Sequence, residues 1–75
     1  MKVYFENSNK KKRIIADIPN GTEEDACNAI KKFLDEHNYK SYYQRRYNIP
    51  VGGSTMTCID VGSWSEFFYV DPPIM

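Results

Sequence analysis

The chain has 75 residues, with ten basic and ten acidic side chains and no net charge at neutral pH. This length predicts a single domain spanning residues 1–75, because it leaves no room for a second hydrophobic core. With no net charge, a whole-molecule attraction to nucleic acid or to an acidic membrane is not implied. We find neither an apolar run long enough to cross a membrane nor a signal peptide, so we expect a cytoplasmic protein.

The first part of the chain predicts a β-hairpin. Residues 2–6 alternate between polar and apolar side chains, with Val3 and Phe5 on one face, as in a half-buried strand. A polar turn at 7–10 and a second strand at 11–18 follow, and the short connection indicates an antiparallel pair. Three residues of the second strand are expected to face the core: Ile14, Ala16 and Ile18.

The segment 21–38 is the only one with clear helical periodicity, and we expect the rest of the fold to be organised around it. Thr22 is a good N-cap, and Asp25 stands at the third helical position, where the partner of a capping box would lie. Asn38 suits the end of the helix. The expected apolar stripe consists of Ala26, Ala29, Ile30, Phe33, Leu34 and His37.

The segment after the helix is rich in tyrosine and contains neither glycine nor proline. Residues 39–48 alternate with a period closer to two than to 3.6, which predicts a third strand. The stretch 50–54, with its proline and two glycines, is expected to form a loop.

Two more strands are expected after this loop. Residues 55–61 alternate again, and Gly62-Ser63 fits a two-residue hairpin turn that starts with glycine. The fifth strand would then span 64–70, with Trp64 in its first position. In the alternative interpretation, Gly62 forms a bulge within one strand from 55 to 70, which would exceed the usual strand length.

These elements predict an α+β fold, a two-layer sandwich of β-β-α-β-β-β order with one amphipathic helix on one face of an antiparallel sheet. One helix covers one face only, so aromatic side chains would crowd the other. Residues expected there are Tyr4, Ile15, Met56 and several of Tyr42, Tyr43, Tyr47, Phe67 and Tyr69. Such a face is usually covered, and a protein partner or a second copy in a homodimer are the candidates.

The tyrosine-rich segment also contains two arginines. This combination is enriched at the energetically important positions of protein–protein interfaces. It also occurs where proteins stack the bases of single-stranded nucleic acid, but the RNA-recognition consensus is absent, so we favour a protein partner. The residues expected to bind that partner are Tyr42, Tyr43, Arg45, Arg46, Tyr47 and Trp64.

A run of four basic residues occupies the first hairpin turn and the start of the second strand: Lys10, Lys11, Lys12 and Arg13. Together with the Tyr/Arg strand, this run could contact phosphates, so the alternative function is a small single-stranded nucleic-acid-binding protein. The interpretation that we favour is a solvated turn whose lysines protect an edge strand from aggregation.

The sequence contains no motif for catalysis or for a cofactor. His37 is the only histidine, and Cys27 and Cys58, which we expect to be free thiols, lack the spacing of a zinc site. An enzyme would have to use Cys58, His37 and Asp60 without any supporting motif. The sequence therefore predicts a non-enzymatic protein without catalytic residues, metal ion or cofactor.

Three stretches, residues 15–22, 33–43 and 60–68, resemble small uncharacterised proteins of Gram-positive phages and mobile elements. Together they reach across most of the chain, and they carry no catalytic signature. The resemblance implies an accessory protein that binds a host or phage protein, in a class that includes inhibitors of host defence such as anti-CRISPRs. It implies action in the host cytoplasm and assigns no functional residue.

Overall fold

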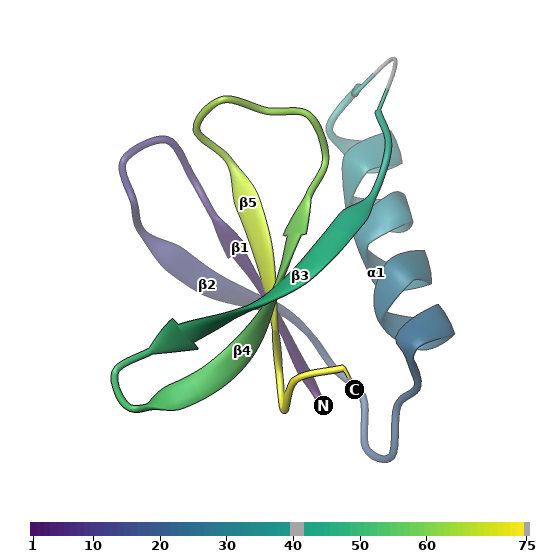
Figure 1. Cartoon of the computed structure of the whole chain (residues 1–75). Helices are drawn as coiled ribbons and strands as arrows, with labels where there is room; N and C mark the ends of the chain where they lie inside the picture. The colour runs from purple at the N-terminus through teal and green to yellow at the C-terminus, as the bar shows by residue number, and fades with distance from the viewer. Residues whose placement is uncertain (40–41, 75) are drawn as a thin grey trace.

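The computed structural model describes residues 1–39 and 42–74, which form one helix and a sheet of five antiparallel strands (Figure 1). The elements are β1 (Lys2–Glu6), β2 (Lys12–Asp17), α1 (Glu23–Glu36), β3 (Arg45–Val51), β4 (Ser54–Asp60) and β5 (Phe67–Asp71). This confirms the predicted α+β class and the β-β-α-β-β-β order.

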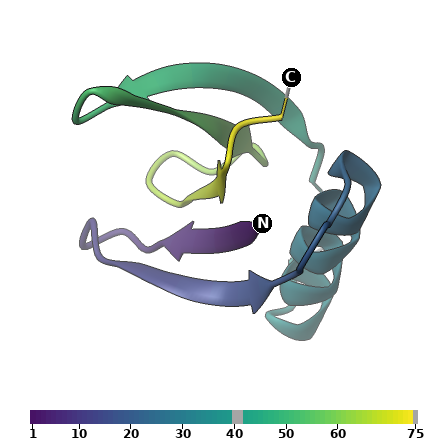
Figure 2. The same cartoon turned by 90° about the horizontal axis from the view of Figure 1, so that it is seen from below.

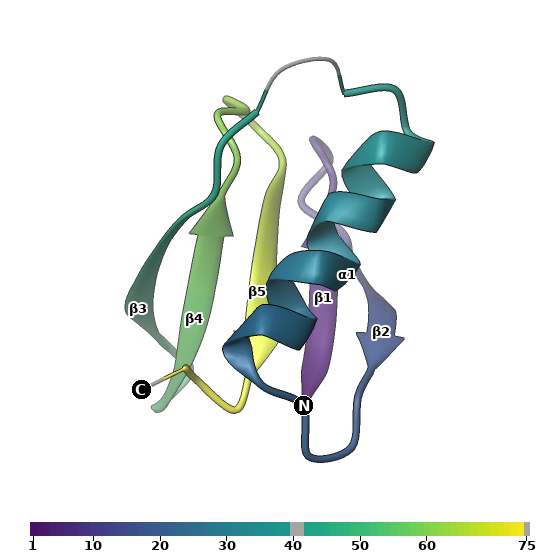
Figure 3. The ribbon, with the colours of Figure 1, turned by 90° about the vertical axis from the view of Figure 1, so that its right-hand side faces the viewer.

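The strands lie in the order β2-β1-β5-β4-β3, so the first strand pairs with the last. The helix runs diagonally in front of β5 and β1, on one face of the sheet (Figure 3). The sheet is strongly twisted, and the β1–β2 and β3–β4 hairpins extend to the side away from the helix (Figure 2). In this strand order, the two edge strands are β2 and β3.

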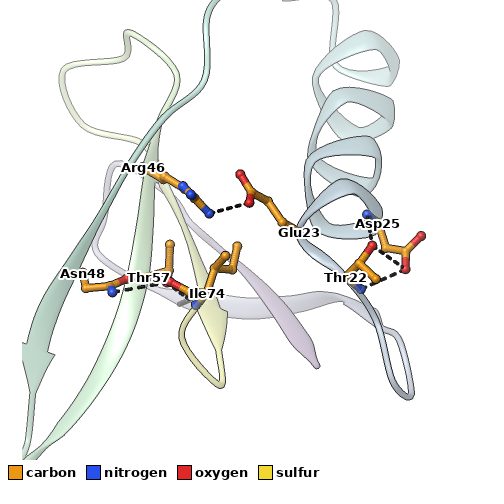
Figure 4. Close-up of polar contacts among 7 residues, drawn as sticks. All are labelled: Thr22, Glu23, Asp25, Arg46, Asn48, Thr57 and Ile74. Carbon is orange, nitrogen blue, oxygen red and sulfur yellow. Dashed lines mark hydrogen bonds and ion pairs between the residues drawn. The ribbon is translucent and has the colours of Figure 1, made fainter.

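The helix begins where the sequence predicts. The Asp25 N–H donates to Thr22 Oγ1 at 3.3 Å, and the Thr22 N–H donates to Asp25 Oδ2 at 2.9 Å, which completes the capping box (Figure 4).

In the core, the ring centroids of Phe5, Phe33 and Phe68 lie between 4.6 and 5.5 Å apart. The helix buries Ala26, Ile30, Phe33 and Leu34.

Strand β2 differs from the prediction because it contains a β-bulge. Val3 pairs with Ala16 and Tyr4 pairs with Ile14, which leaves Ile15 as an extra residue. Ile14 therefore lies on the face opposite the helix and is 51% exposed, whereas Ile15 packs against the core. The predicted faces of Ile14 and Ile15 were wrong, because one extra residue reverses the alternation of the strand.

The third strand starts later than predicted. Of the segment 39–48, only the part from Arg45 onward is paired, and residues 40–41 lie outside the described part of the chain. Tyr39 and Tyr42 pack against the core instead. Both rings therefore pack on the core from a segment that is not a strand.

The same strand also continues further than predicted, through Pro50 to Val51, where a loop was expected. Gly52 and Gly53 both have positive φ, at 53° and 83°, and form a tight turn that keeps the strands on either side paired. Pro50 fits within β3 because an edge strand can lose one main-chain donor.

The C-terminal segment returns to the sheet and is held by a buried threonine. The Ile74 N–H donates to Thr57 Oγ1 at 2.7 Å, and the Thr57 hydroxyl donates to Asn48 Oδ1 at 2.6 Å (Figure 4). Thr57 is fully buried, so these bonds satisfy a polar group that would otherwise destabilise the core.

Candidate functional site

The connection between β4 and β5 is longer than predicted. Strand pairing ends at Asp60 and resumes at Phe67, so residues 61–66 form a loop. The expected two-residue turn and the strand at 64–70 were therefore wrong. Trp64 lies in this loop, and its side chain is 100% exposed.

In this loop, main-chain N–H groups donate hydrogen bonds to side-chain oxygens instead of to a neighbouring strand. The Gly62 N–H donates to Asp60 Oδ1 at 2.8 Å. Ser63 Oγ accepts from two further N–H groups, those of Ser65 at 3.3 Å and Glu66 at 3.1 Å. Such local bonds compete directly with a β-ladder, which explains why the strands separate here. They also give the loop a defined shape.

A further hydrogen bond holds the loop from the segment after the helix. The Tyr39 hydroxyl donates to the Glu66 carboxylate at the end of the loop. Burial, together with this hydrogen bond, raises the pKa of Tyr39 to about 12. The loop is thus tied to the helix-side segment as well as to β4.

Tyr43 packs beside the start of this loop. Gly62 has a φ of +92°, and a Cβ placed on it would lie 3.4 Å from Cε2 of Tyr43. Tyr43 and Trp64 contribute to the wall of an open hollow of about 180 Å³, which also includes Asp60, Gly62 and Ser63. Tyr43 itself is 55% exposed.

Arg45 joins the same group from the first position of β3. Its Nη2 lies 3.2 Å from Asp60 Oδ2, so Asp60 holds both the loop and the arginine. We call Tyr43, Arg45, Asp60 and Trp64 the Trp64 cluster. Tyr47 lies two residues after Arg45 on the same face of β3 and is 42% exposed.

The structure thus brings together Tyr43, Arg45 and Trp64, with Tyr47 close by in the strand, but it separates Tyr42 and Arg46 from them. The Tyr42 hydroxyl donates to Asp35 of the helix at 2.9 Å. Arg46 Nη1 lies 2.6 Å from Glu23 Oε2 in the first turn of the helix (Figure 4). These two side chains connect the helix to the segment leading into β3 and to β3 itself.

Asp60 was not among the residues predicted to bind a partner. Its position two residues before Gly62 is a recognisable Asx-turn signal, because an aspartate side chain accepts the N–H two residues on. The sequence signal was therefore present, but it indicated the turn and not the pairing with Arg45.

The face of the sheet opposite the helix carries a row that crosses all five strands: Ile14, Tyr4, Tyr69, Cys58 and Tyr47. Its centre is closed, because Tyr69 and Cys58 are buried and the Lys12 ammonium lies 4.5 Å from the centroid of the Tyr69 ring. Within this row, the largest exposed fractions are those of Ile14 and Tyr47 at its two ends, at 51% and 42%. The chain therefore covers much of the aromatic face that was expected to be open.

The basic run is divided between the two faces. Lys10 and Lys11 lie exposed in the hairpin turn, and Lys12 covers Tyr69 on the face opposite the helix. Arg13 lies on the helix side, with its guanidinium 5.7 Å from the Phe33 ring centroid. Moreover, β2 and the Tyr/Arg strand β3 are at opposite edges of the sheet, so the two elements of a nucleic-acid site are not adjacent.

The Cys58 thiol and the His37 imidazole lie on opposite sides of the sheet. His37 ends the helix, where it stacks on Phe33 at 4.0 Å and its Nδ1 lies 2.8 Å from the Phe33 carbonyl oxygen. Cys58 is buried on the opposite face of the sheet, and burial raises the pKa of its thiol. In residues 1–39 and 42–74, we find no group of three metal-ligating side chains.

These features define a small α+β domain with an exposed tryptophan on a braced loop. The chain was compared with models of protein families, with curated proteins and with solved structures, and none of the three comparisons gave a match. No helix in the described part of the chain is both long and apolar enough to cross a membrane.

Proposed function

We propose that this chain is a non-enzymatic protein-binding module that contacts its partner through the Trp64 cluster and Tyr47. The observation that carries this proposal is the complete exposure of Trp64 within a loop that is held by hydrogen bonds on both sides. An exposed tryptophan offers a large apolar area, and a braced loop loses little conformational freedom when that area is buried.

The side chains around Trp64 support a protein partner in particular. Trp, Tyr and Arg are the residue types enriched among the energetically dominant positions of protein interfaces. Arg45 is oriented by Asp60 while most of its side chain stays accessible, so it can donate to a partner without first being ordered. Removal of a dominant aromatic side chain from such an interface costs about 2–4 kcal/mol, or about 30- to 1,000-fold in Kd.

The resemblance of residues 15–22, 33–43 and 60–68 to phage and mobile-element proteins supports a narrower proposal. On that basis the chain is an accessory protein that acts in the cytoplasm of a Gram-positive host. Its partner would be a host protein, such as a component of a defence system, which it inhibits by binding.

The test is affinity capture from an extract of a Gram-positive host with three forms of the chain. Wild type and Arg46→Ala should retain the same protein partner, whereas Trp64→Ala should lose it, with all three equally folded by circular dichroism. Arg46 is the matched control because it lies on β3 next to Arg45 but pairs with the helix.

Two results would overturn the proposal. One is retention of every captured protein by Trp64→Ala. The other is capture of single-stranded nucleic acid that weakens steeply as salt rises, which would instead support the alternative function.

A further inference from the structure

The two edges of the sheet differ in their ability to accept another strand. The edge strand β3 contains Pro50, which has no N–H to offer a neighbouring strand. The edge strand β2, at the opposite side in Figure 3, contains no proline and exposes Ile14. Strand addition at an open edge is a common mode of association, so β2 is the edge to consider.

The bulge in β2 makes this strand complementary to a second copy of itself. In the register of β1 and β2, Lys12 lies opposite Glu6 and Asp17 lies opposite Lys2. Because Lys2 and Glu6 are four residues apart in one strand, their partners Lys12 and Asp17 share a face, although they are five residues apart. The extra residue at the bulge accounts for this odd spacing.

We propose that two copies of the chain associate through antiparallel pairing of their β2 strands, with a two-fold axis through the bulge. In this register, Lys12 of each copy lies opposite Asp17 of the other, and Arg13 lies opposite Ala16. Each copy contributes its extra residue, Ile15, at the axis, so the register is the same on both sides of the axis. Such an interface is isologous, because the same patch serves both partners.

The charges and the apolar surface of β2 fit this arrangement. Lys12 is held on its face by Glu6, with Nζ 3.8 Å from Glu6 Oε2, and by the ring of Tyr69. Among residues 1–39 and 42–74, no ion pair involves Asp17, so this carboxylate is available to the other copy. The exposed Ile14 lies next to the axis, where the two copies would cover it.

A charge exchange tests this pairing directly. Lys12→Asp places two acidic residues opposite each other at each end of the ladder, and Asp17→Lys places two basic ones there. We expect wild type to dimerise increasingly with concentration in sedimentation velocity, and each single variant to dimerise about tenfold more weakly. An equal mixture of the two variants restores opposite charges at both ends and should dimerise like wild type.

The control variant is Lys10→Asp, which makes the same charge change in the turn outside β2 and should leave dimerisation unchanged. A wild-type monomer at every concentration would show that the bulge and Lys12 protect this edge from pairing, and would overturn the proposal. So would a dimer that persists in both single variants, or folded variants whose mixture stays monomeric. A second readout needs no variant: amide hydrogen exchange should slow in β2, but not in β3, as wild-type concentration rises.

Discussion

Replacement of Gly62 by alanine tests whether the loop at 61–66 has the shape described above. The φ of Gly62 is +92°, a conformation that costs an L-residue about 1–3 kcal/mol. The added Cβ would meet Tyr43 at 3.4 Å, which is ordinary contact, so backbone strain accounts for most of the expected cost. We expect Gly62→Ala to lower the free energy of unfolding by about 1–3 kcal/mol in urea denaturation.

Gly53→Ala provides a matched control. Gly53 has a similar φ of +83° but no atom within 4 Å of its added Cβ, so it should show the strain without the contact. Both variants should lose similar stability, and only Gly62→Ala should shift the ring NMR signals of Tyr43. A loss below about 0.5 kcal/mol for Gly62→Ala, within the range of neutral surface changes, would refute the loop conformation.

Three further predictions concern the core and its polar contacts. Ile14→Ala should cost less than about 1 kcal/mol because Ile14 is half exposed, whereas Ile59→Ala should cost about 2–5 kcal/mol; equal costs in urea unfolding would contradict the bulge. The pKa of Tyr39 is raised to about 12 in the folded protein, so the Tyr39 hydroxyl ionises first in the unfolded chain, and wild type should lose stability between about pH 10 and 12. Tyr39→Phe should lose less stability over this range. An equal loss of stability in wild type and Tyr39→Phe from pH 8 to 11 would contradict this contribution of Tyr39. Thr57→Val should cost about 1–3 kcal/mol and speed exchange of the Ile74 amide, since that N–H loses its acceptor; unchanged exchange would contradict the contact.

The parts of the fold that could be predicted from the sequence are those governed by local patterns. The capping residues Thr22 and Asp25 act within one helical turn, so the sequence shows them directly. The predicted apolar stripe of α1 is confirmed except at its end, where His37 is exposed. The alternation of Val3 and Phe5 likewise indicates which face of β1 is buried. The pairing of β1 with β5 joins distant residues and has no local signal.

The errors have physical causes that act beyond such patterns. The bulge at Ile15 adds a single residue and reverses the face of Ile14, and the alternation of β2 carries no sign of it. At the candidate site, the tyrosines of 39–48 look equivalent in the sequence. The structure separates them, because Tyr42 binds the helix whereas Tyr43 packs near Gly62 in the loop.

The fluorescence of Trp64 tests the central claim most directly, because Trp64 is the only tryptophan in the chain. The free protein should show the emission of a fully hydrated indole and ready quenching by acrylamide. Addition of the partner retained by wild type should shift this emission to shorter wavelength and protect it from quenching, because the indole becomes buried. A blue-shifted, protected indole in the free protein, or an unchanged spectrum in the complex, would contradict the proposed site.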